Sequence, residues 1–193
     1  METFIKPYLW LIFLIYLGIV LVLPTYRVWK QTGVNPLTFG ATDSAHDYAG
    51  RVFKVLLGLL LGTVLVYCFT DWYGWLSPIA WLERPLIAAA GIWLMGLSLV
   101  WIMVAQYHMK QSWRIGIDDE HHTPLITSGI FAYSRNPVFL GMLVGIGGLF
   151  LLLPNAVTFC LFGVSYVVMQ LQVRLEEAFL EGQHGQAYQA YQH

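Results

Sequence analysis

An arginine-bearing turn and a pair of glutamates are the residues of this chain best suited to chemistry. Arg135-Asn136-Pro137 ends a polar segment and opens directly into a hydrophobic stretch, and Glu176-Glu177 follows the next hydrophobic stretch. Burying such charged groups without partners is costly, so their positions at the ends of apolar segments need a reason. Together these residues predict a site that binds a charged small molecule.

The Asn136-Pro137 pair indicates where a helix begins. Asparagine is a favoured N-cap residue, and proline suits the first helical position. The free amides of Val138 and Phe139 then point back toward the turn, and with Arg135 they could bind a carboxylate or a phosphate. The alternative is that Arg135 only anchors the helix end among lipid headgroups.

The two adjacent glutamates also allow two interpretations. One of them can face the interior of a helical bundle while the other faces water, and an inward carboxylate could bind an ammonium group or ribose hydroxyls. Alternatively, Glu176 and Glu177 are the solvated start of an amphipathic tail that lies on the membrane.

The elements that must position these residues are membrane spans. Apolar residues make up 58% of the 193 positions and charged residues 11%, against about 25% charged residues in a soluble domain. Mean hydropathy is +0.61. Several charge-free stretches have the length that crosses a bilayer. Pro154-Asn155 indicates a turn between the last two spans. Together these features predict one all-α domain over residues 1–193. Its five transmembrane helices are expected at residues 7–26, 52–70, 85–109, 137–153 and 155–173, with a hairpin formed by the last two and an amphipathic helix at the C-terminus.

The basic residues predict the orientation of these spans. With five spans, eight of the ten Lys and Arg residues lie on the side of the C-terminus, and only Lys6 and Arg84 lie on the other side. The positive-inside rule then places the N-terminus outside a plasma or inner membrane and the C-terminus in the cytoplasm. The first span is expected to be a retained helix, because its apolar run is long and no small-residue cleavage site follows it.

Several other classes of site are not supported by the sequence. Asp118-Asp119-Glu120-His121-His122 are consecutive, and consecutive ligands rarely converge on one metal ion, so we expect no metal site. The net charge of −1 offers no basic face for nucleic acid. A transporter would need ionisable groups at mid-membrane, where the charge-free stretches have none.

The last 70 or so residues resemble the integral-membrane methyltransferases, which include isoprenylcysteine carboxyl methyltransferases and phospholipid N-methyltransferases. The resemblance rests on the segment from Leu125 to Gly141, on Glu176-Glu177 and on the final Gly185-Gln186-Ala187-Tyr188-Gln189-Ala190-Tyr191. The chain departs from the family pattern at Asn136, where the family has His, and at Phe139, where it has Tyr. Where the prenylcysteine enzymes carry a substrate-binding arginine, this chain has Gln172, with Arg174 nearby.

The resemblance implies that S-adenosylmethionine is bound by the region 113–193 at the cytoplasmic face. The residues implied on the cofactor side are Thr123, Pro124, Leu125, Ile126, Phe131, Arg135, Asn136, Pro137, Val138, Phe139, Glu176 and Glu177. Leu125, Ile126 and Phe131 are apolar or aromatic and could enclose adenine. On the acceptor side the implied residues are Gln172 and Arg174.

The function expected from these features is methyl transfer from S-adenosylmethionine to a lipophilic or amphiphilic acceptor, within a multi-pass protein of the plasma or inner membrane. The acceptor and membrane lipids are the expected partners. The alternative is a catalytically degenerate, non-enzymatic membrane module of the same fold, because Asn136 and Phe139 depart from the family pattern.

Overall fold

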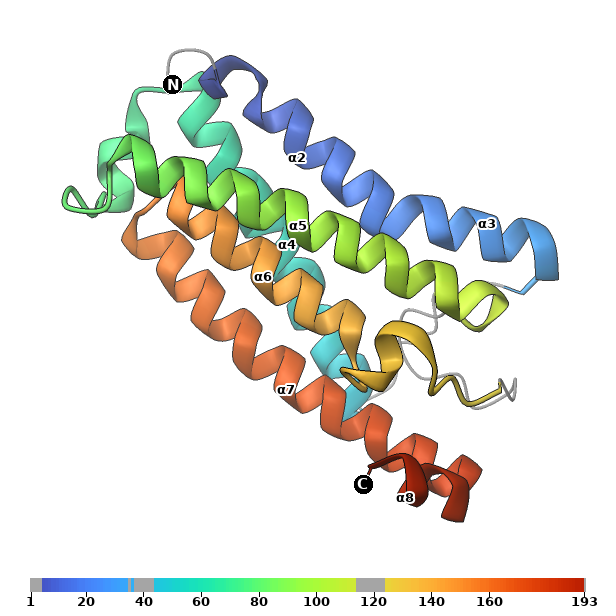
Figure 1. The fold of residues 1–193 in the computed structure, drawn as a ribbon. Helices are drawn as coiled ribbons and strands as arrows, with labels where there is room; N and C mark the ends of the chain where they lie inside the picture. Colours follow the sequence, from blue (N-terminus) through green and yellow to red (C-terminus); the bar gives the residue numbers. More distant parts are fainter. Residues whose placement is uncertain (1–4, 35, 37–43, 114–123, 193) are drawn as a thin grey trace.

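The computed structural model describes residues 5–34, 36, 44–113 and 124–192, and all named elements within these ranges are helices. This confirms the expected all-helical class. Long helices lie side by side in a bundle (Figure 1).

The first helix is continuous from Lys6 to Thr32 but changes its winding along the way. It consists of η1 (Lys6–Tyr8), α2 (Leu9–Leu17), the π-helical segment η2 (Gly18–Val22) and α3 (Leu23–Thr32). The other elements, in chain order, are α4 (Ala45–Phe69), η3 (Trp72–Leu76), α5 (Pro85–Met109), η4 (Lys110–Ser112), η5 (Gly129–Ala132), α6 (Pro137–Leu152), α7 (Ala156–His184) and α8 (Gln186–Gln192).

Among the described residues, four helices are long and apolar enough to cross a membrane: Lys6–Thr32, α4, α5 and α7. The chain is therefore a multi-pass membrane protein. The fifth apolar helix, α6, has 16 residues, and at 1.5 Å per residue it extends about 24 Å. By contrast α7 has 29 residues. Its charge-free part ends at Val173, and the rest of the helix begins with Arg174.

Glycines bring α5 and α6 into close contact. A Cβ atom added to Gly91 would lie 2.6 Å from the carbonyl oxygen of Gly148, and one added to Gly148 would lie 2.7 Å from the carbonyl oxygen of Gly91. Small residues allow this backbone approach, which is the usual way in which helices associate in a bilayer. The two helices therefore form a closely packed pair.

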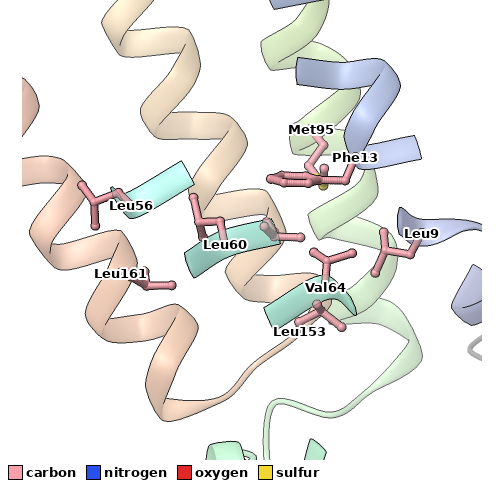
Figure 2. Close-up of a cluster of buried hydrophobic side chains, with 9 residues drawn as sticks. Leu9, Phe13, Leu56, Leu60, Val64, Met95, Leu153 and Leu161 are labelled. Atoms are coloured by element: carbon pink, nitrogen blue, oxygen red, sulfur yellow. The ribbon is translucent and has the colours of Figure 1, made fainter. Parts of the chain in front are cut away.

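A buried apolar cluster joins the helices at the end of the bundle away from the C-terminus (Figure 2). It draws on the first helix, α4, α5, α6, α7 and the α6–α7 turn through Leu9, Phe13, Leu56, Leu60, Val64, Met95, Leu149, Leu153 and Leu161. In the adjoining turn the Asn155 side chain accepts a hydrogen bond from the Thr158 N–H, and this capping box starts α7. The turn fixes the direction in which α7 runs back to the opposite end.

Candidate active site

A cleft of about 890 Å³ lies at the end of the bundle that carries the C-terminus. The short helix α6 begins here between the longer α5 and α7 (Figure 1), and the segment containing η5 and the helix α8 lie beyond its first turn. The walls of the cleft come from residues 131–136, the first two turns of α6, one face of α7, and α8. Because α6 is short, it leaves a space at this end of the bundle, where the polar residues of the turn before α6 meet those of α7.

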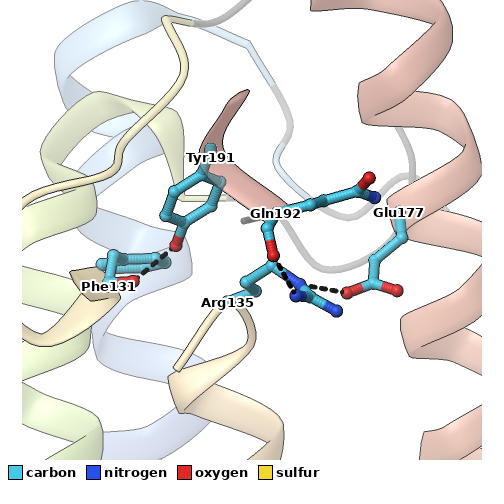
Figure 3. A network of polar contacts seen from close by, with 5 residues as sticks. All are labelled: Phe131, Arg135, Glu177, Tyr191 and Gln192. Atoms are coloured by element: carbon cyan, nitrogen blue, oxygen red, sulfur yellow. Dashed lines mark hydrogen bonds and ion pairs between the residues drawn. The ribbon is translucent and has the colours of Figure 1, made fainter. Parts of the chain in front are cut away.

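Arg135 and Glu177 form an ion pair across this cleft (Figure 3). The Arg135 Nε donates to Glu177 Oε1 at 2.7 Å. The Glu177 carboxylate raises the pKa of the Arg135 guanidinium through this hydrogen bond. The side chains are 41% and 21% exposed, respectively, so both charges are accessible to a ligand that enters the cleft.

The C-terminal helix α8 is joined to the turn by two contacts (Figure 3). The Tyr191 hydroxyl donates to the Phe131 carbonyl oxygen at 2.5 Å, and the Arg135 Nη1 donates to the Gln192 carbonyl oxygen at 3.4 Å. The Tyr188 side chain is fully buried beside them. α8 therefore forms a wall of the cleft, and its position depends on the same arginine that pairs with Glu177.

The start of α6 is held by α5. The indole Nε1 of Trp101 donates to the Pro137 carbonyl oxygen at 2.9 Å. Asn136 occupies the N-cap position, as the sequence suggests, but its side chain makes no capping hydrogen bond and instead lines the cleft. The Val138 and Phe139 N–H groups belong to the first turn, whose amides have no partner within the helix.

Gly129 shows how the preceding turn is shaped. Its φ is +66°, a conformation that residues with a Cβ rarely adopt, and an added Cβ would collide with the His108 imidazole of α5. The His108 ring is held by a 2.8 Å hydrogen bond between its Nδ1 and the Val104 carbonyl oxygen. Glycine is thus required both by the backbone and by the packing of α5 against the turn.

The structure brings part of the predicted set together. Five of the predicted cofactor-side residues line the cleft: Phe131, Arg135, Asn136, Phe139 and Glu177. Leu125, Ile126 and Val138 are half-buried, Pro137 is buried and Pro124 is exposed, and these five do not line the cleft. Ile126 and Val138 pack instead against the core formed by Ala105, Ile130 and Phe131. Thr123 lies outside the described residues.

The other glutamate, Glu176, lies away from the cleft. Gln172 is buried, and its Nε2 lies 2.9 Å from His46 Nδ1 of α4. Removal of the Glu176 carboxyl group from water raises its pKa to about 7, while a hydrogen bond with Gln172 acts in the opposite direction. Arg174 is exposed, and neither Gln172 nor Arg174 lines the cleft. The two adjacent glutamates therefore lie on two different faces of α7.

Some cleft residues are absent from the predicted set. They include Met169 and Gln170 of α7 and Ala187, Ala190, Tyr191 and Gln192 of α8. The spacing of Tyr188 and Tyr191 belongs to the resembling C-terminal segment, and it could have identified the α8 wall. His46 has no comparable signal, because only the packing of α4 against α7 brings it to Gln172.

The described residues contain no group of three or more His, Cys, Asp or Glu side chains that could hold a metal ion. Residues 118–122, where the sequence predicts no metal site, lie outside the described part of the chain.

The fold and the cleft define a multi-pass helical membrane protein with a polar site at one end of its bundle. The family model for phospholipid methyltransferases matches residues 86–187, which extend from the start of α5 into α8 and include most of the cleft. The chain belongs to this family, and membership implies methyltransferase activity on a lipid-like substrate. No curated protein and no solved structure matches the chain.

Proposed function

We propose that the protein transfers a methyl group from S-adenosylmethionine to a lipophilic or amphiphilic acceptor at the cytoplasmic face of the membrane. The observation that carries this proposal is the Arg135–Glu177 pair, which presents one cation and one anion in a cleft of a phospholipid methyltransferase. The α-amino acid end of S-adenosylmethionine carries the matching carboxylate and ammonium groups.

The residues present fit such a ligand. A volume of about 890 Å³ is within the usual range for small-molecule sites, roughly 300 to 1,000 Å³. The Arg135 guanidinium could bind a carboxylate in a bidentate manner, and Glu177 could accept from an ammonium group. Because both side chains are partly exposed, exchanging their mutual contact for contacts with a ligand costs little. The Phe131, Phe139 and Tyr191 rings supply apolar surface for adenosine.

The sulfonium of S-adenosylmethionine supplies an electrophilic methyl group, so the chain needs to contribute orientation and exclusion of water. Arg135 and Glu177 would fix the charged end of the ligand. The N–H groups of Val138 and Phe139 favour a negative group at the start of α6. The α8 wall is attached to Phe131 and Arg135 by hydrogen bonds and would cover one side of the bound ligand.

The geometry favours Glu177 over Glu176 as the carboxylate that contacts the ligand, because Glu177 faces Arg135. On the acceptor side it favours Met169 and Gln170, which line the cleft, over Gln172 and Arg174. The last two residues belong to other faces of α7.

The distribution of basic residues supports the cytoplasmic orientation. The end of α5, which Lys110 follows, and the starting half of α4, which contains Arg51 and Lys54, lie toward the end of the bundle that holds the cleft, whereas the start of the first helix, at Lys6, lies at the opposite end (Figure 1). Arg135 lines the cleft itself. The positive-inside rule assigns the cleft end to the cytoplasm. A plasma or inner membrane is the location that we propose.

Calorimetric titration of the purified protein with S-adenosylmethionine and S-adenosylhomocysteine tests the methyl donor. We expect binding of both ligands. A folded protein that gives no heat and no thermal shift with either ligand would contradict the proposed donor and favour the non-enzymatic alternative.

A further inference from the structure

The start of α4 contacts α7 at a point outside the cleft. The Ser44 side chain accepts a hydrogen bond from the Asp47 N–H at 3.1 Å and caps α4, which places His46 in the first turn of the helix. The Gln172 Nε2 lies 2.9 Å from the His46 Nδ1. An amide nitrogen can only donate, so the His46 Nδ1 is the acceptor and the ring proton lies on Nε2. The hydrogen bond therefore runs from α7 to α4.

Gln172 is the last buried residue of α7, with 5% exposure. The buried residues before it recur every three or four positions and mark the inward face of the helix: Thr158, Leu161, Ser165 and Met169. From residue 173 to residue 184 the side chains are half-buried or exposed. Gln172 is thus the last point at which a buried contact fixes the rotation of α7 before the two glutamates.

The two glutamates lie at different angles to this contact. At about 100° per residue, Glu176 lies about 40° around the helix from Gln172, whereas Glu177 lies about 140° around it. Gln172 also forms a hydrogen bond with the Glu176 carboxyl group, and Glu177 reaches Arg135 across the cleft. A rotation of α7 by about one residue would exchange the two carboxyl groups. The contact at Gln172 opposes such a rotation.

The Gln172 amide is held by these partners in one orientation. Its Nε2 carries two hydrogens, and both the His46 Nδ1 and the Glu176 carboxyl group can accept one. Its Oε1 is buried and has no hydrogen-bond partner among the described residues. An unpaired buried acceptor lowers stability, so this contact is less suited to holding the fold together than to fixing the register of the helix. A single buried polar residue at a helix interface fixes register in coiled coils in the same way.

We propose that His46 is a positioning residue of the site, because through Gln172 it fixes the rotation of α7. This rotation turns Glu177 toward Arg135 and keeps Glu176 out of the cleft. The proposal rests on the proposed function in one respect, which is that Glu177 is the glutamate that contacts the ligand. His46 lies outside residues 86–187, which the family model matches, so family membership assigns it no role. A helix that precedes the matched region thus helps to shape the site.

Thiol accessibility tests the proposal without any ligand. The two cysteines of the chain, Cys68 and Cys160, are replaced by alanine. Glu176→Cys or Glu177→Cys is then introduced, and the rate of reaction of the purified protein with a water-soluble maleimide is measured. With His46 present, the thiol at position 177 should react faster than the thiol at position 176. The ratio of these two rates reports the rotation of α7.

His46→Leu removes the acceptor and keeps a side chain of similar size. The ratio of the rate at position 177 to the rate at position 176 should fall by about three- to tenfold, the factor that corresponds to the loss of one hydrogen bond. His46→Asn again places an acceptor close to the Gln172 Nε2 and should restore most of the ratio. Tyr48→Leu, at an exposed residue of the same helix, is the control and should leave the ratio unchanged.

Gln172→Leu is the reciprocal test. It should lower the ratio as His46→Leu does, and the double variant should show no further fall, because both changes remove the same contact. An unchanged ratio in His46→Leu, or additive effects of the two changes, would overturn the proposal. A variant that only loosens the fold raises both rates together and leaves the ratio unchanged, and this outcome would also overturn it.

Titration with S-adenosylhomocysteine separates this proposal from the proposed function. If the wild type binds the ligand, His46→Leu should weaken binding by about three- to tenfold, and Glu177→Gln should have a smaller effect in this background than in the wild type. Wild-type binding with unchanged affinity in His46→Leu would overturn the positioning role. If the wild type does not bind, the proposed donor is contradicted, while the ratio of the thiol rates still decides whether His46 fixes the rotation of α7.

Discussion

Arg135 and Glu177 are 42 residues apart in the sequence, yet the Arg135 Nε and Glu177 Oε1 atoms lie 2.7 Å apart across the cleft. The short helix α6, the turn that follows it and most of α7 separate the residues, so the pair depends on α6 and α7 returning the chain to the same end of the bundle (Figure 1). Arg135 also contacts the Gln192 carbonyl oxygen. The pair therefore links the turn, α7 and α8.

The first prediction concerns the affinity of the cleft for S-adenosylhomocysteine. Arg135→Ala and Glu177→Gln should each weaken binding by about 10- to 100-fold, because each removes one charge-assisted hydrogen bond. Calorimetry of the purified variants gives the dissociation constants. Arg174→Ala removes an exposed arginine of the same helix outside the cleft and should bind normally. Equal effects of all three changes would show that the pair has no special role.

The second prediction concerns the α5–α6 contact. Gly91→Ala should lower the thermal unfolding midpoint, because the new methyl group meets the Gly148 backbone, which cannot swing away as a side chain can. Overpacking of this kind costs about 1 to 3 kcal/mol. Gly96→Ala on the same helix is the control, since an added Cβ there meets nothing within 4 Å. Indistinguishable midpoints for the two variants would argue against the close contact.

The third prediction concerns the pH dependence of stability. The carboxyl group of Glu176 has a pKa raised by burial from 4.5 to about 7. Between these values the folded protein retains a proton that the unfolded chain releases, so stability should fall as pH rises from about 4.5 to 7 and then level off. The effect of this one group is up to about 3 kcal/mol.

Glu176→Gln should remove this part of the pH dependence and stabilise the protein at pH values above 7. Thermal unfolding across the pH series measures both effects. Glu181→Gln, at an exposed glutamate of the same helix, controls for the loss of one carboxyl group and its charge. A Glu176→Gln profile parallel to that of the wild type would mean that this carboxyl group does not titrate as its surroundings indicate.

The fourth prediction concerns topology. A reporter fused after His193 should indicate a cytoplasmic location, because most basic residues lie at the end of the bundle that carries the C-terminus. Fusion after residue 76, in the connection between α4 and α5, provides the opposite control and should report an external location. An external signal from the fusion after His193 would contradict both the orientation and a cytoplasmic cleft.

The helical class and the approximate position of the site could be predicted from the sequence, and the physical reasons are specific. Charge-free stretches of membrane length identify helices without any knowledge of their packing. Asn136-Pro137 predicts where α6 begins, because proline pre-sets the backbone of the first turn. Each of these signals depends only on residues that are neighbours in the sequence, so it can be recognised without knowledge of the tertiary structure.

Which of Glu176 and Glu177 faces the cleft could not be predicted in the same way. Neighbouring helical residues point about 100° apart, and the sequence does not say which direction faces the cleft. Packing of α7 against α4 decides this, because it places Gln172 against His46 and turns Glu177 toward Arg135. The spacing of Tyr188 and Tyr191 points to the C-terminal segment, but the contacts of Tyr191 with Phe131 and of Gln192 with Arg135 depend on the tertiary structure.

The most direct test of the central claim is methyl transfer by the purified protein in liposomes. The protein is supplied with S-adenosylmethionine carrying an isotopically labelled methyl group and with total membrane lipids, and the label in the extracted lipids is followed over time. We predict label incorporation by the wild type, and a rate at least about tenfold lower for Arg135→Ala and Glu177→Gln at limiting S-adenosylmethionine. A folded wild-type protein that transfers no label, or variants that transfer it at the wild-type rate, would contradict the account.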